Sequence, residues 1–203
     1  QSSLFMTDSN RFGRQRLAWA ILTGSFFSCI LLSVTIPLGI RAILQNSTQS
    51  LDISVQANQG TVGIEEQNGQ RRAVLVGEPP QTVGAQSSIR TDTTASALLT
   101  VRSPEQLEPL TTLQVSGNSI VQFKEATAPR FGLSDNANRM DLDLQAGRVR
   151  LDIPSYTSRP LEVLLTTPQE SNILISEPGR YTLEVSNDVT QVTAQSMGEA
   201  VIT

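Results

Sequence analysis

The chain has no histidine among its 203 residues and only one cysteine, Cys29. Without histidine it lacks the side chain that most often serves as a general base and as a metal ligand. One cysteine can form neither an internal disulfide nor a cysteine-bound metal cluster. No phosphate-binding glycine loop, serine nucleophile elbow or haem-attachment motif occurs either. The sequence therefore predicts a protein that is not an enzyme, with no catalytic residue, no metal site and no cofactor.

Basic and aromatic residues are also scarce. The formal net charge is −4, so a nucleic-acid partner is not expected. Aromatic residues make up 4% of the chain, which argues against a ligand-binding role based on sugar stacking.

The oxygen-rich residues Asp135, Asn136, Asn138, Asp141 and Asp143 could suit calcium. A glycine-containing calcium loop is absent, so a simple polar loop is the preferred interpretation.

Charge is missing altogether from residues 17–40, an apolar run of 24 residues. As a helix this run would span roughly 36 Å at about 1.5 Å per residue, enough to cross a hydrocarbon core of about 30 Å. A cleaved signal peptide would have a shorter apolar region that ends in small residues at a cleavage site. The run is therefore interpreted as a single transmembrane helix, and the lipid bilayer as one of its partners.

The distribution of arginine predicts the orientation of this helix. Arg11, Arg14 and Arg16 precede the apolar run, and only Arg41 follows it closely. By the positive-inside rule, a short tail of residues 1–16 lies in the cytoplasm and the rest of the chain lies outside.

Small residues recur along one face of the predicted helix. Ala20, Gly24 and Ser28 are spaced four residues apart, which places them on the same side of a helix. Such a stripe lets a second helix approach closely and would form a helix-packing interface. Small residues are also common on faces that meet lipid, and the sequence does not separate these two readings.

The remainder of the chain reads as a polar tether, residues 41–57, followed by a β-domain, residues 58–203. Apolar and polar residues alternate there between turn residues, which predicts an all-β, sandwich-like and hairpin-rich fold. A weak repeat places a strand on each side of a glycine, and it is interpreted as repeated hairpins; the glycines are Gly60, Gly117, Gly147 and Gly198.

Two arginines in this domain are candidates for a docking surface. Arg148 and Arg150 alternate with Val149 and Leu151, so both should lie on the polar face of one strand. An ordinary solvated sheet face is the simpler interpretation, and a docking surface for an acidic partner is the more specific one.

The β-domain resembles the FecR-like family, named after the ferric-citrate signalling regulator. The resemblance lies in a glycine-led turn followed by an I-x-T-D motif and a short apolar strand, in an L-x-L-x-x-G-x-V-x-V hairpin, and in a closing pattern within residues 163–185. The residues that carry the first two motifs are Gly84, Ile89, Thr91, Asp92, Ala97, Leu99, Leu142, Leu144, Gly147, Val149 and Leu151. The resemblance covers residues 58–203 and implies a β-rich extracytoplasmic domain, usually in bacteria.

These features predict a structural or accessory subunit of a larger bacterial membrane complex, with a photosynthetic or respiratory complex as one plausible host. Its partners would be other membrane-protein subunits, and its location the cytoplasmic (inner) membrane with the β-domain on the periplasmic side. Two alternatives remain: a transmembrane signal transducer of the FecR type, and a cell-envelope ligand-binding module. Regulators of that family usually hold a sigma factor through a cytoplasmic helical domain. Residues 1–16 are too short to supply such a domain, which disfavours the transducer.

Overall fold

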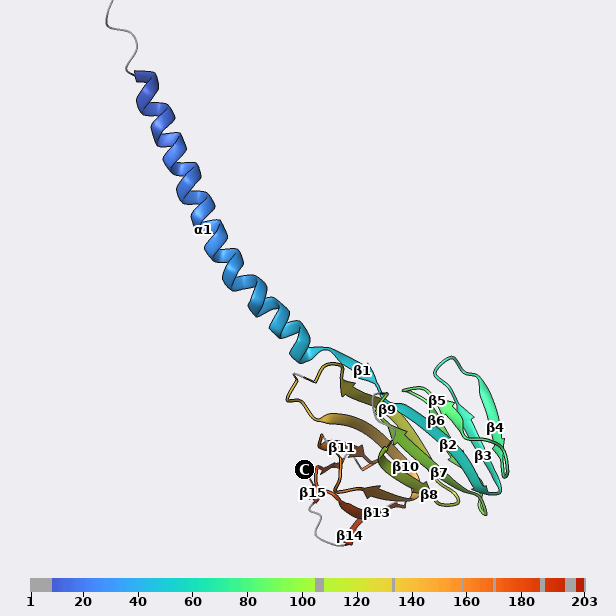
Figure 1. Ribbon diagram of the computed structural model, residues 1–203. Helices are drawn as coiled ribbons and strands as arrows, with labels where there is room; N and C mark the ends of the chain where they lie inside the picture. Colours follow the sequence, from blue (N-terminus) through green and yellow to red (C-terminus); the bar gives the residue numbers. More distant parts are fainter. Residues whose placement is uncertain are drawn as a thin grey trace, which may run out of the picture. The chain divides into compact units, whose positions relative to one another are not determined.

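The computed structural model describes residues 9–104, 108–132, 134–157, 159–169, 171–186, 189–195 and 200–202 (Figure 1). The chain divides into two compact units, Gln1–Asn46 and Ser47–Thr203. The first unit contains a single described helix, α1, and the second contains the strands.

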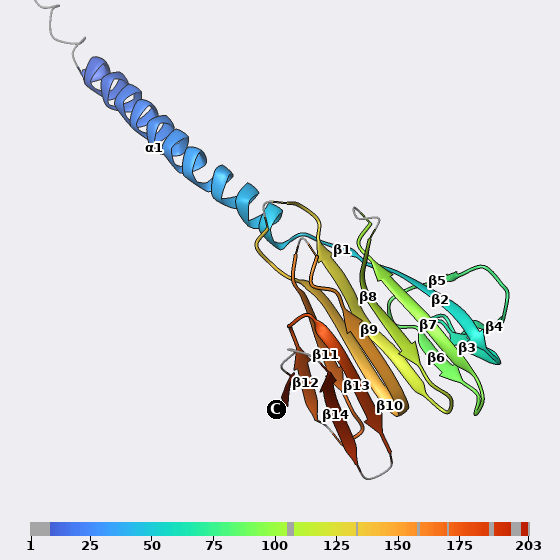
Figure 2. The same ribbon diagram turned by 60° about the horizontal axis from the view of Figure 1, so that its bottom comes forward.

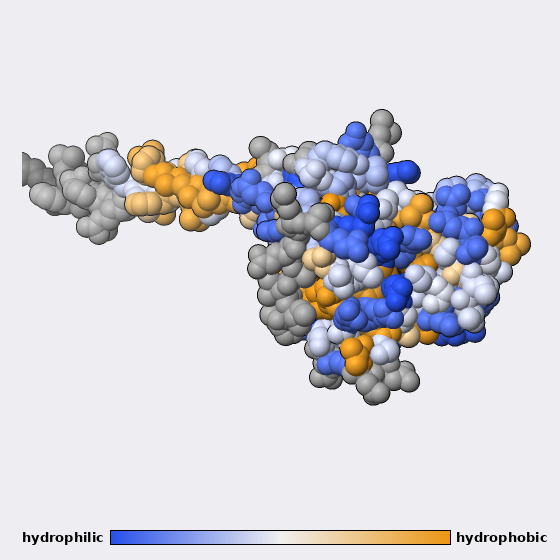
Figure 3. Space-filling model, turned by 90° about the horizontal axis from the view of Figure 1, so that it is seen from below, coloured by the Kyte–Doolittle hydropathy of each residue, from blue (hydrophilic) through white to orange (hydrophobic). Residues whose placement is uncertain are grey.

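Helix α1 runs from Ser9 to Asn46, and its part Leu17–Asn46 is long and apolar enough to cross a membrane. Its large apolar side chains are exposed, and they form the apolar stretch along α1 in Figure 3. Two hydroxyl groups in the middle of this stretch bond to the helix itself: Ser33 donates to the carbonyl of Cys29 at 2.7 Å, and Thr35 donates to that of Leu31 at 2.8 Å. A hydroxyl satisfied in this way does not need water, so it is tolerated in an apolar surrounding.

The helix is longer than expected, and the expected tether over residues 41–57 is wrong. The helix continues past Pro37 to Asn46, whose side-chain amide donates to the carbonyl of Ala42 at 2.9 Å. Arg41 carries charge but does not break a helix, and apolar residues with good helix propensity follow it. The first strand begins at Thr48, so the β-domain begins before residue 58.

The second unit is mainly β, as the sequence predicts. Alternation produces its strands: the second one buries Ile53, Val55 and Ala57 and exposes Gln56. Among the described residues, the strands form one continuous and nearly barrel-like sheet. They are β1 (Thr48–Ser50), β2 (Asp52–Gln59), β3 (Thr61–Glu65), β4 (Arg71–Leu75), β5 (Gln81–Val83), β6 (Ser88–Thr91), β7 (Ser96–Arg102), β8 (Pro109–Val115), β9 (Ile120–Pro129), β10 (Asn138–Ile153), β11 (Leu161–Thr166), β12 (Asn172–Ile175), β13 (Gly179–Val185), β14 (Thr190–Gln195) and β15 (Ala200–Ile202).

Strand β10 joins two halves of this sheet (Figure 2). Its first part pairs in parallel with β11 over residues 138–143 and in antiparallel orientation with β9 over residues 139–146. Its last part pairs in antiparallel orientation with β13 over residues 147–153 and with β8 over residues 149–152. We call the strands on the first side half A (β1, β3, β4, β6, β9, β11, β12 and β15) and those on the second side half B (β2, β5, β7, β8, β13 and β14).

The sheet order runs β4-β3-β6-β9-β10-β8-β7-β2-β5, which leaves β4 and β5 at its two ends. A side chain bridges these ends: the guanidinium of Arg72 on β4 donates to the carbonyl of Thr82 on β5 at 2.7 Å. The same Nη2 atom lies 2.7 Å from a carboxylate oxygen of Glu66. No backbone ladder joins β4 to β5 among the described residues, and Arg72 provides a side-chain link across this seam.

At three of the repeated glycines the chain crosses from one half of the sheet to the other. Their interpretation as hairpin turns is therefore wrong. The chain leaves half B for half A at Gly60, between β2 and β3, and again near Gly117, between β8 and β9. It returns from half A to half B at Gly147, inside β10. No backbone ladder joins β2 to β3 or β8 to β9 in the described chain, so these pairs are corners. Gly198 lies outside the described residues.

The three described corners need glycine for different reasons. Gly60 and Gly147 have φ of 64° and 93°, a region that favours glycine. At the corner between β8 and β9, the residue with a positive φ, 54°, is Asn118. Glycine is needed at position 117 because there is no room for a side chain. A side chain at Gly117 would overlap the backbone of Thr93.

One hydrophobic core fills the space enclosed by the sheet. The residues expected there from the alternation of β10 and β11 are buried: Val149, Leu151, Val163 and Leu165. Side chains from both halves belong to the same cluster, so neither half has a core of its own.

Candidate functional site

The stripe of small residues lies on an exposed part of α1. Ala20, Gly24 and Ser28 are all exposed, and a side-chain carbon built at Gly24 would meet nothing within 4 Å. Bulky side chains such as Trp19 and Phe27 protrude from the same helix. The stripe is therefore a depression in the helix surface where another helix can approach, and its role as an interface stays a prediction.

Arg148 and Arg150 both lie on the exposed face of β10 in half B, but their surroundings differ. Arg148 forms an ion pair with Glu184, its neighbour on β13, with Nη2 and Nε at 2.7 and 3.0 Å from the same carboxylate oxygen. Arg150 has the uncharged Thr182 and Gln114 as its cross-strand neighbours. The positive charge offered to an acidic partner at this surface is thus concentrated at Arg150.

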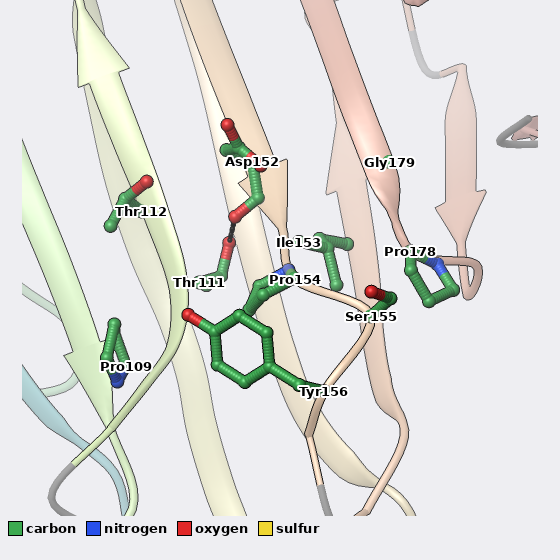
Figure 4. A pocket seen from close by; sticks show the side chains of 10 residues that line it. All are labelled: Pro109, Thr111, Thr112, Asp152, Ile153, Pro154, Ser155, Tyr156, Pro178 and Gly179. Carbon is green, nitrogen blue, oxygen red and sulfur yellow. Dashed lines mark hydrogen bonds between the residues drawn. The ribbon is translucent and has the colours of Figure 1, made fainter. Parts of the chain in front are cut away.

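A groove that sequence reasoning missed lies where β8, β10 and β13 meet, with a volume of about 630 Å³ (Figure 4). Its walls come from segments far apart in the chain. The lining residues are Pro109, Thr111, Thr112, Asp152, Ile153, Pro154, Ser155, Tyr156, Pro178 and Gly179. Tyr156 was visible in the sequence as an aromatic residue just after a strand, but only strand pairing reveals the other walls.

Two hydrogen-bonded links fix the shape of the groove. The Thr111 hydroxyl donates to the backbone carbonyl of Asp152 at 2.9 Å, which ties β8 to β10. The Asp152 carboxylate accepts two hydrogen bonds from Arg180 on β13, at 2.9 and 3.1 Å. The ring of Tyr156 is 62% exposed and lies across the groove with its hydroxyl toward the β8 side (Figure 4).

The I-x-T-D motif of Ile89, Thr91 and Asp92 forms a structural joint in this chain. The buried Thr91 hydroxyl donates to the carbonyl of Ser116 at 2.6 Å and accepts from the backbone N–H of Ser119 at 3.0 Å. The Asp92 carbonyl accepts from the N–H of Asn118 at 3.2 Å. These bonds hold the corner between β8 and β9 against the end of β6. The motif residues therefore have a structural role in this corner.

Two carboxylates of the oxygen-rich segment form ion pairs. Asp141 binds Arg139 at 3.1 Å, and this hydrogen bond, together with the negative charge of Asp141, raises the pKa of Arg139. Asp143 lies 3.7 Å from Lys124 on β9. In the described part of the chain, no three His, Cys, Asp or Glu side chains are placed to hold a metal ion.

The geometry therefore offers three surfaces for interaction: the exposed apolar helix with its stripe, the face of half B around Arg150, and the groove at Tyr156. Comparison with protein-family models, with curated proteins and with solved structures found no match to this chain.

Proposed function

We propose that this chain is a non-enzymatic, single-pass membrane protein that acts as an accessory or scaffold subunit of a larger bacterial membrane complex. Its second unit would be a FecR-like, sandwich-like domain on the extracytoplasmic side. The observation that carries this proposal is the 30-residue apolar stretch of α1, whose side chains are exposed. Apolar surface of this extent is unfavourable in water, so lipid or partner helices are its natural surroundings.

The orientation follows from charge. Arg11, Arg14 and Arg16 lie at one end of the apolar stretch, and Arg41 near the other. The bias of positive residues toward the N-terminal end supports an N-terminus in the cytoplasm of a bacterial cell, at its inner membrane.

Attachment to other subunits would use the two units differently. The stripe at Gly24 would receive a partner helix within the membrane, and the exposed face around Arg150 would contact an acidic surface outside it. The β-domain buries a core of its own, so it can present this face as a rigid surface.

Labelling of engineered cysteines tests the orientation. In a Cys29→Ser background, Gln67→Cys lies on an exposed turn of the β-domain, and Ser3→Cys lies in the tail. A membrane-impermeant maleimide added to spheroplasts should label Gln67→Cys at once and Ser3→Cys only after lysis. The reverse pattern would overturn the orientation, and labelling of both sites without lysis would overturn the membrane-spanning helix.

Purification in a mild detergent, with mass spectrometry of the co-purifying proteins, tests the subunit role. We expect a defined set of membrane-protein subunits in constant ratio to this chain. Recovery of the chain alone, from membranes in which it is correctly oriented, would contradict an accessory role.

A further inference from the structure

We propose that the groove at Tyr156 is a binding site for one unit of a neutral saccharide. The groove has a volume of about 630 Å³ and mixes an exposed aromatic ring with hydroxyl and carboxylate groups. Small-molecule sites usually have volumes of about 300–1,000 Å³, with apolar walls and a few placed polar groups. This inference is independent of the subunit role, because it uses only the residues of the β-domain that line the groove.

The aromatic ring provides the apolar platform. The low aromatic content of the chain argued against sugar stacking in general, but one exposed ring in a groove is enough to stack a single sugar unit. Tyr156 is 62% exposed, whereas the other tyrosine, Tyr181, is fully buried. A tyrosine ring combines an apolar face with a polar end, so an exposed ring at the rim of a groove offers a surface that a ligand can cover. One face of a pyranose ring consists of C–H groups, which stack on an aromatic face while the hydroxyl groups stay at the edge.

Polar groups stand where the hydroxyl groups of a stacked sugar would be. Thr112 and Asp152 are cross-strand neighbours on β8 and β10, and Ser155 precedes the tyrosine in the same wall. Figure 4 shows the side chains of Thr112 and Asp152 on the opposite side of the groove from the Tyr156 ring. Both hydrogen bonds from Arg180 end on Oδ2 of Asp152, which leaves Oδ1 to accept from a ligand hydroxyl.

The charge of the groove favours a neutral ligand. Asp152 is the one charged residue among those that line it, and Arg180 neutralises it at 2.9 Å. An acidic sugar or a phosphate would be repelled by the Asp152 carboxylate, and no cation among the lining residues would offset this repulsion. Such a ligand would therefore bind more weakly than a neutral one. A neutral hexose unit makes hydrogen bonds to this ion pair without disturbing it.

A proline-rich peptide is the competing occupant, and the groove fits it less well. Such peptides dock in grooves that are lined by several aromatic side chains. Here one ring is present, and the other apolar walls are the prolines Pro109, Pro154 and Pro178. These rings are rigid and shape a single compartment beside Tyr156.

Saturation-transfer NMR tests the site on the full chain in phosphatidylcholine nanodiscs. Alkyl maltosides and glucosides must be avoided, because their sugar headgroups would compete for the groove. The probes are maltohexaose, cellohexaose and the hexamer of N-acetylglucosamine. We expect transfer to the ring C–H protons of at least one probe, and loss of affinity by about tenfold or more in Tyr156→Ala.

Three variants make the assignment specific. Tyr156→Phe keeps the platform and should keep the binding, whereas Asp152→Asn should weaken it through the lost acceptor charge. Val76→Ala removes an exposed apolar side chain outside the groove and should leave binding unchanged. Absence of transfer from all three probes would overturn the proposal, as would unchanged affinity in Tyr156→Ala. Binding of decaproline in place of the sugars would assign the groove to peptides and reject the saccharide.

Discussion

At the scale of single residues, the fold depends on a few positions where the chain passes between the two halves. Two corner glycines lie against the segment that joins β6 to β7, and a third lies against the residue that precedes β9. Gly60 approaches Ala95, Gly117 approaches Thr93, and Gly147 approaches Ser119. The corners are thus packed on one another, and a side chain at any of them would push apart two segments.

Gly147→Ala should destabilise the β-domain strongly. The residue has φ of 93°, and a methyl group there would overlap the side chain of Ser119. The two penalties together should lower the free energy of unfolding by about 2–4 kcal/mol. Urea unfolding of the isolated domain, residues 47–203, measures this change.

Gly84→Ala is the matched control, because Gly84 has no positive φ and no atom within 4 Å of an added methyl group. It should unfold within about 0.5 kcal/mol of the unchanged domain. Equal stability of the two variants would show that the corner at Gly147 tolerates a side chain.

Tyr181 should make the domain sensitive to alkaline pH. Its ring is fully buried, its hydroxyl donates to the carbonyl of Glu177 at 3.0 Å, and burial, with a smaller contribution from the charge of Glu177, raises its pKa. The unfolded chain would lose this proton near pH 10, before the folded chain does. Between the two pKa values the folded state binds more protons, so stability falls as pH rises above about 10.

Tyr181→Phe should lower the stability at neutral pH by about 1 kcal/mol through the lost hydrogen bond, and should flatten the alkaline decline. Urea midpoints measured from pH 8 to about pH 11 compare the two proteins. Parallel curves for tyrosine and phenylalanine would mean that another group causes the alkaline loss.

At the scale of elements, α1 shows both the power and the limit of local sequence signals. The absence of charge over residues 17–40 predicted the helix, because apolar length is a local property. Its end at Asn46 was missed, because Arg41 was read as the beginning of a polar linker. A single charge does not end a helix when residues of good helix propensity follow it.

The strands show a similar division. Alternation identified buried positions such as Leu151 and Val163, since it depends only on neighbouring residues. It could not show that β10 takes part in both halves, because that depends on partners distant in the sequence. Asp152 pairs with Thr112, 40 positions earlier, and with Arg180, 28 positions later. The groove at Tyr156 was missed for the same reason.

The stripe on α1 leads to a test at this scale. Gly24→Leu fills the depression between Ala20 and Ser28, and it should weaken association with a partner helix by about 1 kcal/mol or more. Quantitative co-purification from membranes measures the loss. Leu22→Ile changes the shape of an exposed side chain off the stripe and serves as the control. Equal recovery of partners by both variants would mean that the stripe faces lipid.

At the scale of the whole molecule, the β-domain should fold without the helix. Its strands share one core and form a compact unit separate from Gln1–Asn46. Residues 47–203 expressed alone should be soluble, β-rich by circular dichroism and cooperative on melting. An aggregated or molten product would show that the domain requires a partner in order to fold.

Adjacent residues of β10 provide the matched pair for this test. Leu151 is buried in the shared core, so Leu151→Asp places an unpaired carboxylate there and should abolish the melting transition. Arg150→Asp makes a similar change on the exposed face and should preserve the transition. A cooperative transition in Leu151→Asp would contradict the continuous core.

The position of β10 also bears on how the protein is made. Strands β2 to β9 leave the ribosome before β10, but one edge of β8 and one edge of β9 can pair only with β10. In a nascent chain that ends before residue 138, the edges of β8 and β9 that face β10 are therefore open, one in each half. Open edges recruit other strands, so prematurely terminated chains should be substrates for chaperones and proteases. A single 16-residue strand pairs with both of these edges when it arrives.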